Sequence, residues 1–177
     1  MNKLVIAALA IISLAGLVSP LQARSKAQAV TNAEEFAQEL KSAGQFEIES
    51  SVLALQRTKD EAIRQFAQKM IHDHTEAAGK LTETLKQANL PEPAYGQDAE
   101  HKDLFNTLFV AEQEPQFVAQ YVQDQIQGHE KVVALIEAYL KDGDNEALKQ
   151  YASTILPMIK EHLKLAEGLR PNVTARR

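Results

Sequence analysis

Hydrophobic residues recur at helical spacing in four long stretches of the chain. The clearest runs through Phe66 to Leu81, where steps of three and four residues place apolar side chains on one face. That face consists of Ile63, Ala67, Met70, Ile71, His74, Ala77, Ala78, Leu81 and Leu85. The three other faces lie between Phe36 and Leu55, Val118 and Leu140, and Leu148 and Leu169. Four amphipathic helices in one small domain predict an all-α, four-helix bundle.

Capping residues mark where the first two helices begin. Thr31 or Asn32 precedes the first helix and is followed three residues later by a glutamate, as in a capping box. Thr58-Lys-Asp-Glu61 is a second box of this kind, so we expect the second helix to begin at Lys59 or Asp60. Two long helices with so short a joint form an antiparallel hairpin.

A long connection, residues 89–114, separates the second and third long helices. It contains a short amphipathic piece between His101 and Phe109 that predicts a short helix. The second helix, of roughly thirty residues, would be about 45 Å long, and an up-down bundle would need only a few residues to turn back after it. A connection of this length predicts instead the crossover of a ferritin-like bundle. A simple up-down bundle with an inserted helical hairpin is the alternative.

Each apolar face carries one inward polar residue that can bind a metal ion: Glu47, His74, His129 and His162. Histidine and carboxylate side chains suit zinc, copper, iron or manganese. We counted distances from the helix joints at about 1.5 Å per residue. Glu47 and His74 then lie within a turn or so of each other along the first hairpin, and His129 and His162 do so along the second. We therefore predict a metal site formed by these four residues, with Asp73 as an outer acceptor that orients a histidine. Imidazoles more than about 8 Å apart could not share one ion.

Two other interpretations of these residues stay open. Di-iron bundles use Glu-x-x-His motifs, whereas isoleucine stands three residues before each of the three histidines, so a standard di-iron site is not expected. The four polar residues could also be core groups that hydrogen-bond to one another or to free carbonyls. His72 and His101 fall off the apolar faces and are predicted to lie at the surface.

The chain carries the motif Phe66-Ala-Gln-Lys-Met-Ile-His-Asp-His74, followed by Tyr121 with His129 and by Leu156-Pro157 with His162. In these residues it resembles an exported bacterial family, the domain of unknown function 4142. The similarity runs from about Asn32 to Leu169. Proteins of this family often carry the label of predicted outer membrane protein. The resemblance implies a ferritin-like fold and an exported location, and it implies no particular activity.

The N-terminus has the form of a secretory signal. Met1-Asn-Lys3 is followed by an apolar run to Val18, which is short for a membrane span. Small residues offer cleavage after Ala23 or Ala29, so residues 1–23 are predicted to be a signal peptide. A retained N-terminal anchor is the alternative. A proline at position 171 predicts the end of the last helix, which leaves 31–170 as a single domain and 171–177 as a flexible tail.

Composition narrows the function classes. The formal net charge of −5 disfavours a nucleic-acid-binding surface, and the absence of cysteine removes disulfides and thiolate sites. No glycine-rich phosphate loop is present, and the residues favour a binding protein over an enzyme. We expect a periplasmic protein of the Gram-negative envelope, without a stable membrane span after cleavage, that binds a metal ion or small ligand and serves in envelope stress protection. The alternative is a structural or interaction bundle that binds a protein partner or a second copy of itself.

Overall fold

The computed structural model describes residues 30–174, and these residues form five helices. The helices are α1 (Ala33–Arg57), α2 (Glu61–Gln87), α3 (Ala99–Val110), α4 (Glu114–Asp142) and α5 (Glu146–Thr174). The predicted all-α helical bundle is confirmed. The predicted signal peptide, 1–23, and the last three residues of the predicted tail lie outside the described residues.

The N-termini of the first two helices are capped by side chains. Asn32 caps α1, because its Oδ1 accepts hydrogen bonds from the backbone N–H groups of Glu34 and Glu35. The expectation that Thr58 caps α2 is wrong: Asp60 is the cap and accepts from the N–H groups of the first turn. The Thr58 hydroxyl instead accepts from the Asp60 N–H and donates to Glu114 of α4. Thr58 is buried, so its hydroxyl joins the α1–α2 turn to the start of α4.

The last helix is longer than the sequence predicts. α5 passes Pro157 and Pro171 and ends at Thr174, so the expected end before Pro171 is wrong. Proline has a φ angle close to that of a helix and removes only one hydrogen-bond donor, so it need not end a helix that is otherwise held in place.

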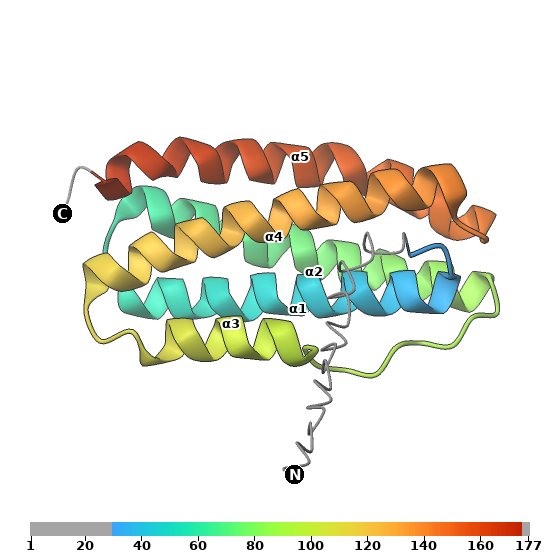
Figure 1. The fold of residues 1–177 in the computed structure, drawn as a ribbon, viewed down its shortest axis with the longest axis horizontal. Coiled ribbons are helices and arrows are strands. Elements are labelled where there is room, and N and C mark those ends of the chain that lie inside the picture. The colour runs from blue at the N-terminus through green and yellow to red at the C-terminus, as the bar shows by residue number, and fades with distance from the viewer. Residues whose placement is uncertain (1–29, 175–177) are drawn as a thin grey trace, which may run out of the picture.

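The four long helices lie side by side, and α3 packs along the outside of α1 (Figure 1). α1 pairs with α2 and α4 pairs with α5, while α2 contacts α5 and α1 contacts α4. α2 and α4 run in the same direction, because the connection and α3 carry the chain back along the bundle (Figure 1). None of the helices among residues 30–174 combines the length and apolar character needed to cross a bilayer.

The hydrophobic core consists of two clusters, and each takes residues from all four long helices. The first includes Phe46, Met70, Ile126 and Ala166, and the second includes Leu40, Leu81, Ile136 and Ile159. Along α2, α4 and α5 the sequence passes from one cluster to the other at a buried histidine. The fold therefore places a polar layer between two apolar cores.

Candidate metal centre

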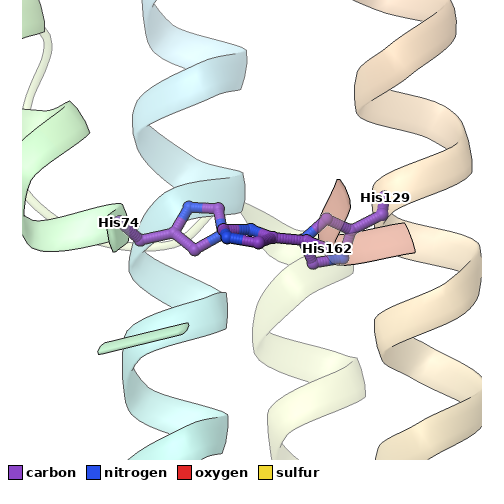
Figure 2. A group of neighbouring side chains, drawn as sticks. All are labelled: His74, His129 and His162. Atoms are coloured by element: carbon purple, nitrogen blue, oxygen red, sulfur yellow. The ribbon is translucent and has the colours of Figure 1, made fainter. Parts of the chain in front are cut away.

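Three histidines from three helices converge in this polar layer: His74 of α2, His129 of α4 and His162 of α5 (Figure 2). Their ring centroids are 5.2 to 5.6 Å apart, inside the limit of about 8 Å for a shared ion. The side chains are 7%, 1% and 0% exposed, respectively. Each ring offers a nitrogen that lies within 4.8 Å of the nitrogens offered by the other two.

Hydrogen bonds determine which nitrogen of two of these rings is free. His129 Nδ1 lies 2.7 Å from the carbonyl oxygen of Gln125, and His162 Nε2 lies 2.7 Å from Oδ2 of Asp73. Because both partners are acceptors, these two nitrogens carry the protons and donate. Among the described residues, His129 Nε2, His162 Nδ1 and His74 Nε2 are buried without any hydrogen-bond partner. His129 Nε2 and His162 Nδ1 therefore each keep a lone pair, and His74 Nε2 keeps one when that ring carries its proton on Nδ1.

The three rings are spaced closely enough for one nitrogen of each to approach a coordination site. Around an ion about 2.0–2.1 Å from each nitrogen, the nitrogens are roughly 3.4 Å apart. From separations of at most 4.8 Å, each ring would need to move inward by no more than roughly 0.8 Å to reach that spacing. Such a shift requires small changes in side-chain torsion and leaves the helices in place.

Burial keeps the three imidazoles neutral. It lowers the pKa of His129 to about 4, although the bond to the Gln125 carbonyl opposes the shift. Burial, together with the two neighbouring rings, holds the pKa of His74 well below its usual value. Burial also lowers the pKa of His162, against the raising effect of Asp73. Neutral imidazole is the form that binds metal ions, so the site needs little deprotonation at pH 7.

Asp73 joins α2 to His162 on α5 and is the acidic group that orients this ring. Its carboxylate also pairs with Lys69 at 3.0 Å, and Lys69 reaches Glu161 at 3.5 Å. Partial burial raises the pKa of Asp73, but the hydrogen bonds from His162 and Lys69 outweigh it and lower the pKa. A carboxylate that accepts from the non-ligating nitrogen of a histidine fixes its tautomer and increases its basicity.

Glu47 of α1 lies beside His129. Its Oε1 is 3.7 Å from Nδ1 of that ring, the nitrogen that donates to the Gln125 carbonyl. Its Oε2 is buried and has no hydrogen-bond partner within the described part of the chain. Burial raises the pKa of Glu47 to about 8, with a further contribution from Asp124. Gly128 makes room for this carboxylate, since a Cβ there would meet Oε1 at 3.1 Å.

Gln125 lies one turn before His129 on the same apolar face and was not among the predicted site residues. Its carbonyl fixes the His129 tautomer, and its side-chain Nε2 donates to Ser50 of α1 at 3.2 Å. Gln125 is fully buried, as is Ser50. A polar residue four positions before a candidate ligand, on the same face, is the signal that could have identified it.

The two remaining histidines lie outside the cluster. His72 is exposed, as predicted. His101 is half-buried, so its predicted surface position is wrong, because α3 packs against α1. Its Nδ1 contacts both Ser42 Oγ at 3.0 Å and Asp98 Oδ2 at 2.8 Å. A Ser-His-Asp triad needs the serine and the aspartate on opposite ring nitrogens, so this cluster serves to cap α3 and tie it to α1.

The fold and this site define the class of the protein as an all-helical bundle with a buried cluster of three histidines. Residues 18–169 match the family described as domain of unknown function (DUF4142), and the chain belongs to that family. No protein with a curated description matches the sequence.

Solved structures of a protein named CopM share the fold. CopM in the Cu(II)-bound form aligns with a TM-score of 0.65 at 16% identity, over 80% of this chain and 97% of CopM. The Cu(I)-bound form aligns with a TM-score of 0.63 at 16% identity, over 78% and 95% of the two chains. A silver-bound form obtained by co-crystallization aligns with a TM-score of 0.63 at 16% identity, over 80% of this chain and 96% of that one. At this level of identity the likeness shows a common fold.

Proposed function

We propose that this protein binds a transition-metal ion through His74 Nε2, His129 Nε2 and His162 Nδ1. Two observations carry the proposal. Each of the three buried imidazoles has a nitrogen with no hydrogen-bond partner among residues 30–174, and one nitrogen of each ring lies within 4.8 Å of one nitrogen of each of the other two. Asp73 orients His162 from outside the site. Glu47 lies next to His129. Once the ion displaces the proton that its raised pKa retains at pH 7, its carboxylate balances the charge of the ion, or binds it after a change of side-chain torsion.

The unpaired nitrogens favour metal binding over a purely structural role. A buried polar group without a partner costs about 1–3 kcal/mol, and a structural cluster would be expected to pair its groups with each other. Here His129 and His162 each donate from one ring nitrogen, and the other nitrogen of each is buried without a partner among the described residues, as is His74 Nε2. That division of roles is the one found in metal-binding histidines.

The donor set favours borderline ions. Three neutral imidazoles, with no thiolate in the chain, suit copper, zinc, iron or manganese, and divalent copper binds such donors most tightly. CopM, which shares the fold, has structures in copper-bound and silver-bound forms. Copper is therefore the first ion to test.

The test is metal analysis of protein purified without an affinity tag and then incubated with Cu(II) or Zn(II). We expect one ion per chain in the native protein and a loss of stoichiometric binding in His74→Ala and His162→Ala. His72→Ala is the matched control, because His72 is an exposed histidine of the same helix as His74. Native protein that binds no metal, and that melts at the same temperature with and without added ions, would contradict the proposal and favour the structural bundle.

We further propose a location and an architecture for this activity. The signal-like segment 1–23, with cleavage after Ala23 or Ala29, supports a periplasmic protein that sequesters metal ions in envelope stress protection. The shared direction of α2 and α4 supports a ferritin-like bundle whose crossover is the connection with α3. Mass spectrometry of the N-terminus in a periplasmic extract tests the location, and an intact Met1 would contradict it.

A further inference from the structure

A cavity of about 300 Å³ lies between α1, α2, α4 and α5 and reaches the histidine cluster. His74, His129 and Glu47 form part of its wall. The rest of the wall is mostly apolar and includes Leu40, Leu81, Val132, Ile155 and Ile159. Because two of the three imidazoles form part of this wall, an ion held between the three rings would lie beside the cavity.

The cavity extends from the core to the surface at the connection between α2 and α3. Glu92 and Tyr95 of that connection belong to its wall, and Tyr95 is 79% exposed. Lys41 of α1 holds the connection in place, with its ammonium 2.9 Å from both the Glu92 carboxylate and the Pro93 carbonyl. The cavity therefore joins the surface near Tyr95 to the part of the core that carries His74 and His129.

We propose that the ion at the three-histidine centre binds a small external ligand in this cavity, namely a molecule with one donor atom and an apolar body. This inference rests on the metal site proposed above. Three protein ligands leave a fourth coordination position for an external group. A cavity of about 150 Å³ already accommodates benzene, so one twice that size has room for a donor group joined to a ring.

The lining determines the class of ligand. The Tyr151 hydroxyl donates to the Ala77 carbonyl and is not free for a guest. The other polar side chains of the wall are Lys41, Gln45, Thr82, Glu92 and Tyr95, and they are paired with one another or with other protein groups. This leaves the ion and Glu47 as polar partners for a guest, with aliphatic side chains around them. A ligand rich in hydroxyl or charged groups would lose its hydration without replacement. A small azole carrying an apolar substituent meets both requirements, since its nitrogen reaches the ion and its body fills the apolar space.

The test compares imidazole with 4-phenylimidazole, which share the donor nitrogen and differ in the apolar ring. Each is titrated into Co(II)-loaded protein, whose visible absorption bands report the coordination of the ion, and cobalt content is measured after gel filtration. Burial of the phenyl group should make 4-phenylimidazole bind roughly ten- to a hundredfold more tightly than imidazole.

Two variants locate the binding site. Ala78 borders the cavity and is itself exposed, so Ala78→Phe narrows the cavity without crowding the core. We expect this variant to keep its cobalt and to lose the advantage of 4-phenylimidazole by about tenfold. Ala62→Phe is the matched control, an exposed alanine of the same helix away from the cavity. It should behave as the native protein does.

The outcomes separate the two proposals. Stoichiometric cobalt with no preference for 4-phenylimidazole, or a preference that survives Ala78→Phe, overturns the ligand site and leaves the metal site standing. Protein that binds neither cobalt, zinc nor copper overturns the metal site, and the ligand site with it.

Discussion

Replacement of His74 by leucine distinguishes a binding site from a structural cluster. Within residues 30–174 the His74 Nε2 has no hydrogen-bond partner, and the ring packs against the rings of His129 and His162. An unpaired buried group of this kind costs about 1–3 kcal/mol. Leucine has a similar volume and no polar atom, and an imperfect fit costs less than about 1.5 kcal/mol. We therefore expect His74→Leu to raise the free energy of unfolding of the metal-free protein by about 1 kcal/mol.

The assay is thermal unfolding, followed by circular dichroism, of native and variant protein in a chelator and in excess copper. A gain of about 1 kcal/mol raises the melting temperature of the metal-free variant by roughly 2–4 °C in a domain of this size. An ion at a hundred times its dissociation constant stabilises the native protein by about 2.7 kcal/mol, a rise of roughly 5–10 °C. The variant should lack that second rise, so the order of stability reverses between the two conditions.

His72→Leu is the control, because His72 is exposed on the same helix and its replacement should change stability by no more than about 0.5 kcal/mol. A metal-free His74→Leu protein that melts several degrees below the native protein would refute the reasoning. That result would mean that the imidazole makes a stabilising interaction in the core, as a structural cluster requires.

Three further predictions follow from the surroundings of the site. Asp73→Asn should weaken copper binding by about 10- to 100-fold in a competition titration, because His162 loses its charged acceptor. The metal-free protein should unfold at lower urea concentrations as the pH falls from 6.5 to about 4. Burial lowers the pKa of all three histidines, and the protons that the unfolded chain takes up on them outweigh the opposite effect of the raised pKa values of Glu47 and Asp124. Gly128→Ala should stabilise the protein by about 1 kcal/mol less than Gly79→Ala in thermal unfolding. Both replacements gain helix propensity, but only the Cβ at position 128 would crowd Glu47, at 3.1 Å from Oε1.

The helices and the inward histidines were predictable from the sequence because both depend on a local period. A residue that continues the i, i+3, i+4 pattern lies on the buried face wherever the partner helices come from. His74, His129 and His162 all continue such patterns, and all three are buried. Their depths along the helices followed from counting residues from the two hairpin joints.

The orientation of the polar groups around the histidines was not predictable in this way. Asp73 lies beside the apolar face of α2, and its bond to His162 depends on where α5 packs against α2. Glu47 belongs to the apolar face of α1. The helical period of α1 does not predict that its carboxylate lies near Nδ1 of His129. His101 was expected at the surface because it falls off the apolar faces. That expectation failed because the sequence carries no local signal for the packing of α3 against α1.

The arrangement of the core explains how the bundle tolerates unpaired imidazoles. Each of the two hydrophobic clusters joins all four long helices, so each can hold the bundle together without help from the polar layer. The layer lies between them, and the free nitrogens cost stability that the clusters offset. If the histidines served mainly to join the helices, their nitrogens should be directed at each other or at free carbonyls. Instead, His162 donates to Asp73 and His129 donates to the Gln125 carbonyl. The other nitrogen of each ring has no partner among the described residues and is left for a ligand.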